Sequence, residues 1–228
     1  MQDALTSQFD VSEAKLERIV ADALKGADDG ELYLEYEESE SLLFDNGKLK
    51  SGNYSTDRGF GLRSVLGESS GYAHSGELSE AALLRAADAV SAVTHGASGT
   101  YSAAPQRTNK LLYTAQNPLA APGFEEKVKL LQSIDAYLRG KDERVRQVSV
   151  SIAANWQVVE ILRADGHRVR DVRPMTRLNI SVVAGIGDRQ ENGSYGMGGR
   201  KLFGDFLTEQ SWRHGADEAL RQALVNLD

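Results

Sequence analysis

The fold is decided by the stretch Glu31-Leu-Tyr-Leu-Glu-Tyr36 and the turn that follows it, Asp45-Asn-Gly-Lys48. From Leu32 to Glu37 two sets of side chains alternate, which is the period of a half-buried strand. Asn46-Gly47 is a strong signal for a two-residue hairpin turn, because both residue types adopt positive φ easily. The chain is therefore predicted to enter a β-hairpin here.

Two further strand-like runs follow the hairpin, Arg58–Leu66 and Ser69–His74. Gly67-Glu68 between them suits a second tight turn. Together these runs predict a four-stranded antiparallel meander within residues 31–77.

Helical patterns flank the predicted meander. Residues 11–26 repeat apolar side chains at helical spacing, and Asp10 with Glu13 forms a plausible capping box in front of them. A second helix is predicted from Ser79, its expected N-cap, to about Thr94. The first half thus reads helix, meander, helix.

The second half repeats this order of elements. It begins with a helix over 124–139, continues with alternating strands around the turn Asp165-Gly166, and ends in a helix that runs to Leu227. The predicted fold class is α+β, with two helix–antiparallel β-meander–helix halves whose sheets are covered by helices.

The predicted domains follow the two halves. They are an α+β domain at 1–96, a linker at 97–122 that is rich in Pro, Ala, Ser and Thr, and a second α+β domain at 123–228.

Charge and composition exclude several classes of protein. Residues 1–100 carry a net charge of −10 (8 Lys+Arg, 18 Asp+Glu) and residues 101–228 one of +3 (18 and 15), so nucleic acid is not an expected partner. No apolar run is long enough to span a membrane, and the N-terminus lacks the features of a secretory signal. The chain has no cysteine, which fits a cytoplasmic location.

No catalytic or metal-binding residue can be assigned from spacing. The four histidines lie far apart, and there is neither an H-E-x-x-H helix nor a G-x-S-x-G elbow. The acidic run Glu35 to Glu40 could form a glycosidase-like pair, although a charged strand face is the commoner reason for such a run.

A glycine-rich run, Gly193 to Arg200, leaves two interpretations open. It superficially resembles a phosphate-binding loop, but the Walker lysine is missing. Alternatively, its glycines let two backbones approach closely, and the run accepts an extended peptide by strand addition, with Arg200 pairing with a carboxylate.

Short segments in order along the chain resemble the TldD/PmbA family, and its TldD side in particular. In the first half the likeness is carried by the meander, including Asn46 to Tyr54, Asp57 to Arg63 and Gly71-Tyr-Ala-His74. In the second half it is carried by Lys141 to Gln147, Ala164-Asp-Gly166, Asp171 to Pro174, Gly196 to Arg200 and Ala223 to Leu227.

The resemblance implies a cytoplasmic, zinc-dependent metalloprotease, a family also called modulators of DNA gyrase. It implies cleavage of unfolded or extended peptides and a TldE/PmbA-like partner subunit or self-association. The family's zinc motif, H-E-x-x-x-H, belongs to a C-terminal domain that is absent from this chain, so no catalytic or metal residue is carried over. Zinc is therefore expected in the full-length protein, and this chain alone is expected to be inactive.

Two functions are expected in consequence. The first is the non-catalytic N-terminal region of a TldD-like metalloprotease, which shapes the substrate chamber and the subunit interface. The alternative is a stand-alone binding or regulatory module of the gyrase-modulator type without hydrolytic activity. Candidate residues for the chamber or interface are Arg63, Tyr72, Arg177, Gly196, Gly198, Gly199 and Arg200.

Overall fold

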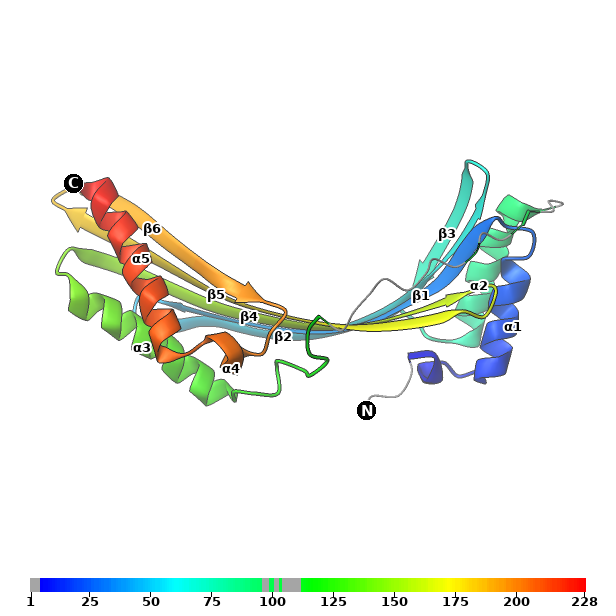
Figure 1. Cartoon of the computed structure of the whole chain (residues 1–228), viewed down its shortest axis with the longest axis horizontal. Helices are drawn as coiled ribbons and strands as arrows, with labels where there is room; N and C mark the ends of the chain where they lie inside the picture. Colours follow the sequence, from blue (N-terminus) through cyan, green and yellow to red (C-terminus); the bar gives the residue numbers. More distant parts are fainter. Residues whose placement is uncertain (1–4, 96–98, 101–102, 104–111) are drawn as a thin grey trace. The chain divides into compact units, whose positions relative to one another are not determined.

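The computed structural model describes residues 5–95, 99–100, 103 and 112–228 (Figure 1). The chain forms two compact units, each built from three separate segments. Unit 1 comprises Met1–Glu37, Thr56–Lys110 and Gln157–Val172. Unit 2 comprises Glu38–Ser55, Leu111–Trp156 and Arg173–Asp228. Consecutive parts of one strand can therefore belong to different units.

Six strands form one sheet in the order β3-β2-β1-β4-β5-β6. The β2–β3 and β5–β6 pairs are antiparallel. The strands are β1 (Asp29–Asp45), β2 (Lys48–Leu66), β3 (Ser69–Ser75), β4 (Val145–Arg163), β5 (Arg168–Ile186) and β6 (Arg189–Gly199). The α+β class predicted from the sequence is confirmed. β3 and β6 are the two edge strands.

Two details of the predicted sheet are wrong. The meander at 31–77 has three strands rather than four, because β2 runs without a break through Gly52 and Gly59. The two halves also share a single sheet instead of forming one sheet each. In the second half the glycine-rich run is itself a strand, β6.

The predicted hairpin turns are present. Asn46 and Gly47 have φ angles of 51° and 78°, the left-handed values that a two-residue turn of this kind needs. Gly67 has a φ angle of 56° in the predicted β2–β3 turn, and Gly166 has one of 79° in the predicted Asp165-Gly166 turn. Gly187, with a φ angle of 58°, begins the β5–β6 turn, which was not predicted. These turns fix the register of both edge strands.

In unit 1, helices α1 (Glu13–Ala23) and α2 (Glu80–Ser91) pack on one face of the sheet. The short helices η1 (Leu5–Gln8) and η2 (Ala92–Thr94) accompany them. The core between the helices and the strands consists of fully buried apolar side chains. They include Leu16, Val20, Leu32, Leu34, Phe60, Leu62, Leu83 and Val90.

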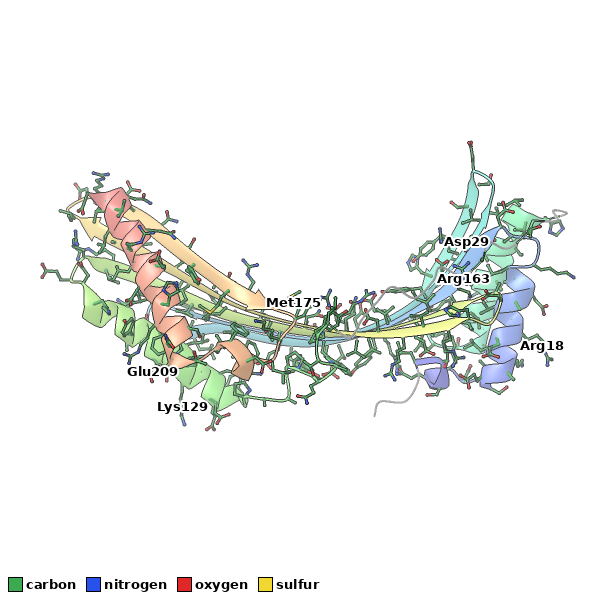
Figure 2. The ribbon with its side chains drawn as sticks, viewed as in Figure 1. Arg18, Asp29, Lys129, Arg163, Met175 and Glu209 are labelled. Atoms are coloured by element: carbon green, nitrogen blue, oxygen red, sulfur yellow. The ribbon has the colours of Figure 1, made fainter. Side chains whose placement is uncertain are left out.

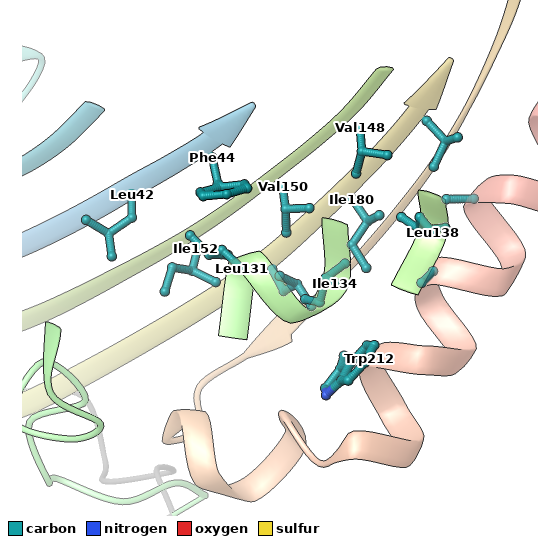
Figure 3. Close-up of a cluster of buried hydrophobic side chains, with 14 of the residues drawn as sticks. Leu42, Phe44, Leu131, Ile134, Leu138, Val148, Val150, Ile152, Ile180 and Trp212 are labelled. Atoms are coloured by element: carbon teal, nitrogen blue, oxygen red, sulfur yellow. The ribbon is translucent and has the colours of Figure 1, made fainter. Parts of the chain in front are cut away.

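In unit 2, helices α3 (Phe124–Lys141) and α5 (Glu209–Leu227) cover one face of the sheet, and α4 (Phe203–Phe206) precedes α5. Figure 3 shows the core beneath them, where side chains from strands and helices interdigitate. Its members include Leu42, Phe44, Leu131, Ile134, Leu138, Val148, Val150, Ile152, Ile180 and Trp212.

One predicted helix cap is confirmed and one is wrong. The Ser79 hydroxyl accepts a hydrogen bond from the Ala82 N–H at 3.1 Å, as an N-cap should. Asp10 does not cap α1, whose N-cap is Ser12; its carboxylate instead accepts the backbone N–H of Glu80 at 2.6 Å. Asp10 therefore ties the start of α2 to the segment before α1.

The domain boundaries at 1–96 and 123–228 stay a prediction, and the compact units are not consecutive stretches of this kind. The predicted linker at 97–122 falls partly outside the described residues. Among the helices in the described part of the chain, none has the length and hydropathy needed to cross a membrane.

Candidate functional site

Unit 1 carries a pocket of about 420 Å³ on the strands β1, β2 and β3. Its lining is aromatic and polar, and it includes the core residue Phe60. The lining residues are Tyr33, Glu35, Asp57, Arg58, Gly59, Phe60, Gly61, Tyr72, His74, Ser75 and Gly76.

Tyr72 is the most exposed aromatic side chain of this pocket, with 66% of its surface accessible. Its ring stacks on His74 at a centroid distance of 5.6 Å, since the two residues are neighbours on one face of β3. The ring also lies over Gly61, where a Cβ atom would come within 2.7 Å of the tyrosine hydroxyl. A glycine at position 61 therefore makes room for the Tyr72 side chain.

Arg63, the other candidate in unit 1, pairs with Tyr72 across β2 and β3. Its Nε donates to a Glu31 carboxylate oxygen at 2.7 Å, and its Nη2 lies 3.3 Å from Asp29. The hydrogen bond to Glu31 raises the pKa of Arg63. Asp29 also accepts a hydrogen bond from Arg163 Nη2 at 2.7 Å. Figure 2 labels both side chains. Arg63 is thus held in an ion-pair network beside Tyr72.

The five candidates of unit 2 gather at β5 and β6. Arg177 pairs with Gly198 across the two strands, and its Nε donates to Asn179 Oδ1 at 2.7 Å. A Cβ atom at Gly196 would lie 3.2 Å from the Arg177 guanidinium, and one at Gly198 would lie 2.1 Å from the Thr176 carbonyl oxygen. Position 198 therefore admits only glycine.

Gly199 is the last residue of β6, and Arg200 follows it. Gly199 pairs with Thr176, whose hydroxyl donates to the Lys201 carbonyl oxygen at 2.9 Å. The Arg200 guanidinium lies 4.9 Å from the centre of the Tyr113 ring. Arg200 is thus in contact with an aromatic ring, a favourable arrangement for a guanidinium.

The acidic run is divided among separate partners. Tyr33 donates its hydroxyl proton to Glu35 at 2.5 Å, Asn117 donates to Glu38 at 2.8 Å, and Lys127 donates to Glu40 at 2.9 Å. Glu38 and Glu40 thus bind residues outside β1, whereas Glu35 binds a residue of its own strand.

A metal centre does not fit the residues that the structure describes, because no group of three or more His, Asp or Glu side chains is arranged to hold an ion. His74 stacks on Tyr72, and His214 packs edge-on against Tyr195 at 5.8 Å. Both histidines thus contact an aromatic ring rather than a second potential metal ligand.

Sequence reasoning missed Tyr33 and Gly61 of the unit 1 pocket. The sequence does contain a pattern that predicts the unit 1 pocket. Tyr72 and His74 alternate on a predicted strand, and the tight hairpin places them opposite Arg63 and Gly61.

Two family models match the chain, and their descriptions are "PmbA/TldA metallopeptidase domain 1" at residues 30–93 and "PmbA/TldA metallopeptidase central domain" at 117–227. The two matched ranges together take in most of the sequence. The chain belongs to the PmbA/TldD metallopeptidase family.

Curated relatives point to the TldD side of this family. The chain is 36% identical over 215 residues to a protein of Haemophilus influenzae named metalloprotease TldD homolog, covering 89% of this chain and 44% of that protein. A TldD homolog of Buchnera aphidicola is 32% identical, with 88% and 43% covered. The chain thus spans less than half the length of these relatives.

Solved structures share the fold. A putative modulator of DNA gyrase from Thermotoga maritima superposes with a TM-score of 0.75 at 14% identity, covering 95% of this chain and 49% of that chain. TldE from Thermococcus kodakarensis gives a TM-score of 0.71 at 12% identity, with 92% and 47% covered. At these identities the likeness concerns the fold alone.

Proposed function

We propose that this chain is the N-terminal, non-catalytic region of a TldD-like zinc-dependent metalloprotease of the cytoplasm. Its role is to shape the chamber that receives extended or unfolded peptides and the interface to a TldE/PmbA-like partner subunit. The observation that carries the proposal is the match to both family domains, together with the 36% identity to a TldD homolog of more than twice the matched length.

The proposal assigns zinc binding and peptide contact to different parts of the complete protein. A zinc protease needs three protein ligands and an open position for water. The described residues supply no such group, so the zinc and the hydrolytic residues are assigned to the remainder of the full-length protein.

The surfaces of both units support a role in peptide contact. The unit 1 pocket combines exposed Tyr72 with carboxylates and glycines, a mixture that can contact a peptide side chain. The β6 edge of unit 2 offers backbone groups, which contact any extended peptide regardless of its sequence.

The test compares the complete gene product with this 228-residue chain. We expect the complete protein to cleave an unfolded peptide. We also expect it to contain about one zinc ion per chain, because the proposed site holds a single metal ion. A chelator should abolish cleavage, and this chain should show neither zinc nor cleavage. A complete protein without zinc or peptidase activity would instead support the stand-alone binding or regulatory module.

The partner is tested separately. Mixing the complete protein with the TldE/PmbA-like protein of the same genome should give a complex in size-exclusion chromatography with light scattering. Two species that elute unchanged would remove the partner from the proposal.

A further inference from the structure

The dipeptide Asn-Gly occurs twice in the chain, at Asn46-Gly47 and at Asn192-Gly193. In such a pair the glycine amide nitrogen can attack the side-chain carbonyl carbon of the asparagine, because glycine has no Cβ atom to hinder the approach. Both asparagines are exposed, and both belong to unit 2. A difference in reactivity between them therefore depends on how the fold holds each glycine.

The nitrogen of Gly193 is engaged in the sheet. Gly193 pairs with Val182 of β5, and the next residue, Ser194, donates its N–H to Gln222 of α5 at 3.3 Å. Because the N–H groups of successive strand residues point in opposite directions, that of Gly193 points towards β5. A Cβ atom at Gly193 would lie 2.1 Å from the Ala219 carbonyl oxygen, so α5 covers this residue as well. The nitrogen becomes available only after β6 opens locally.

The nitrogen of Gly47 is in the opposite situation. Gly47 is exposed in the β1–β2 turn, has a φ angle of 78°, and has open space where a Cβ atom would lie. The backbone hydrogen bond of a two-residue turn joins the residues that flank it, so the second turn residue keeps a free N–H. The first turn residue, Asn46, is held by its own N–H, which donates to the Val148 carbonyl oxygen at 2.9 Å. Attack by the Gly47 nitrogen therefore requires no strand to open.

The side chain of Asn46 is also prepared for attack. Its Oδ1 accepts a hydrogen bond from Arg139 Nη2 at 2.6 Å, and Arg139 is fixed on α3 by its Nε, which donates to Asp135 at 3.1 Å. A guanidinium at this oxygen stabilises the negative charge that develops there when a nucleophile adds to the carbon. Among the residues that the structure describes, Nδ2 of Asn46, the leaving group, has no hydrogen-bond partner.

We propose that Asn46 is a site of spontaneous deamidation, promoted by Gly47 and Arg139, and that the fold protects Asn192. The Gly47 nitrogen forms a bond to Cγ of Asn46, the Cγ–Nδ2 bond breaks, and Nδ2 leaves as ammonia with the proton of the Gly47 nitrogen. Water then opens the cyclic succinimide at either of its carbonyl carbons. The turn gains one carboxylate, as aspartate or as isoaspartate.

The two products change the hairpin in different ways. Aspartate places a carboxylate oxygen where Oδ1 lies, beside Arg139. Isoaspartate instead adds a methylene group to the backbone of the two-residue turn, and the length of such a turn sets the register of the strands that it joins. Because the turn is exposed, an enzyme that methylates isoaspartyl carboxylates could reach this product.

The test follows both asparagines in the folded chain at neutral pH. Circular dichroism verifies that the chain stays folded, and peptide mapping by mass spectrometry after digestion at mildly acidic pH measures each site. Asn46→Asp supplies the standard for the aspartate product, and a protein isoaspartate methyltransferase with a labelled methyl donor detects isoaspartate. We expect Asn46 to react about tenfold or more faster than Asn192, because the reaction at Asn192 requires local opening of the strand.

The unfolded chain is the matched control, because guanidinium chloride removes the fold and keeps the sequence. There the two sites should react at rates within about threefold of each other, since little of the native structure remains to separate them. If Asn192 stays slow in the unfolded chain, its flanking residues protect it and the proposal fails. The proposal also fails if Asn46 does not react in the folded chain, or if the two sites react equally there.

The contribution of the guanidinium is tested with Arg139→Ala. This variant should slow the reaction at Asn46 about threefold in the folded chain, a small part of what a buried oxyanion donor contributes. It should have no effect in guanidinium chloride. Lys141→Ala removes a cation of the same helix that pairs with Asp217 at 3.1 Å, and it should leave the rate unchanged. Thermal unfolding verifies that both variants are folded. A rate that Arg139→Ala does not lower would overturn the role of Arg139.

Discussion

Lys127 Nζ lies 2.9 Å from a carboxylate oxygen of Glu40, although the lysine side chain is only 2% exposed. The ammonium group also lies 3.4 Å from the Leu119 carbonyl oxygen and 5.6 Å from the centre of the Phe203 ring. A buried cation with this many partners ties α3 to β1 within unit 2.

Replacing Lys127 by Ala should destabilise the protein by about 3 kcal/mol, because it leaves the Glu40 carboxylate without its partner in a largely buried place. Urea unfolding measures the change. The Arg85–Glu77 pair, with both side chains more than 60% exposed, is the control, and Arg85→Ala should cost less than about 1 kcal/mol. Equal costs for the two variants would show that burial does not matter here.

Glu160 holds the start of the described chain in unit 1. Its buried carboxylate accepts the Leu5 N–H at 2.7 Å and lies 3.4 Å from Arg168 Nε. Glu160→Ala should therefore release η1 and increase amide exchange over Leu5–Gln8 at least about tenfold. Glu17→Ala removes a partly exposed partner of Arg168 and should leave that exchange nearly unchanged. Exchange that stays slow in Glu160→Ala would contradict this role.

Asp142 should make the free energy of unfolding depend on pH, with greater stability at the higher pH. Hydrogen bonds from the Arg144 side chain, and then from its backbone N–H, lower the pKa of Asp142 from 3.8 to about 2. A carboxyl whose pKa is lowered by folding stabilises the protein above its unfolded pKa, and this stability is lost as the pH falls through about 2.

The measurement for Asp142 compares the chain with Asp142→Asn by urea unfolding at pH 5 and at acidic pH. The advantage of the unmodified chain should be about 1 kcal/mol at pH 5, reduced by solvent screening of this partly exposed pair, and should shrink as the pH approaches 2. An advantage that does not depend on pH would contradict the assigned cause.

Two glycines should respond in opposite directions to the same change. Gly47 has a φ angle of 78° in the β1–β2 turn, so Gly47→Ala should destabilise the protein by about 1 kcal/mol. Gly140 lies in helix α3 with nothing near a new Cβ, so Gly140→Ala should stabilise by about 0.5 kcal/mol. Thermal unfolding of both variants checks the signs.

Local signals in the sequence were sufficient for the turns and for most helices. Asn46-Gly47 and Ser79 act through their own backbone or that of residues three positions away, so their roles can be predicted without the fold. Asp10 was misjudged because its partner, Glu80, lies 70 positions further on.

The lengths of the strands could not be read in the same way. The run Arg58–Leu66 looks like a strand of its own, yet it continues the strand that begins at Lys48 after the hairpin turn, and both runs belong to β2. Pro174 interrupts the pattern of β5, but pairing with β6 begins only at Thr176, so the missing N–H costs no ladder bond.

The candidate residues of the chamber or interface stay a prediction, but the structure shows which of them lie opposite one another. Arg63 lies opposite Tyr72, and the turn Gly67-Glu68 that sets this register was predicted from the sequence. Arg177 lies opposite Gly198, but the turn at Gly187 that sets this second register was not predicted. The hydrogen bonds from the Ser194 N–H to Gln222 and from Asn226 to the Asn192 carbonyl oxygen depend on how closely α5 approaches Gly193, which spacing does not reveal.

The sheet joins strands that are far apart in the sequence, and this has a consequence for folding during synthesis on the ribosome. β1 ends at Asp45, but β4, its neighbour in the sheet, begins only at Val145. At bacterial or eukaryotic speeds of synthesis this interval lasts about 5 to 20 seconds. During that time one edge of β1 in the nascent chain has no partner strand for its backbone hydrogen bonds. A chaperone or a strand of another chain can bind this edge in the same period.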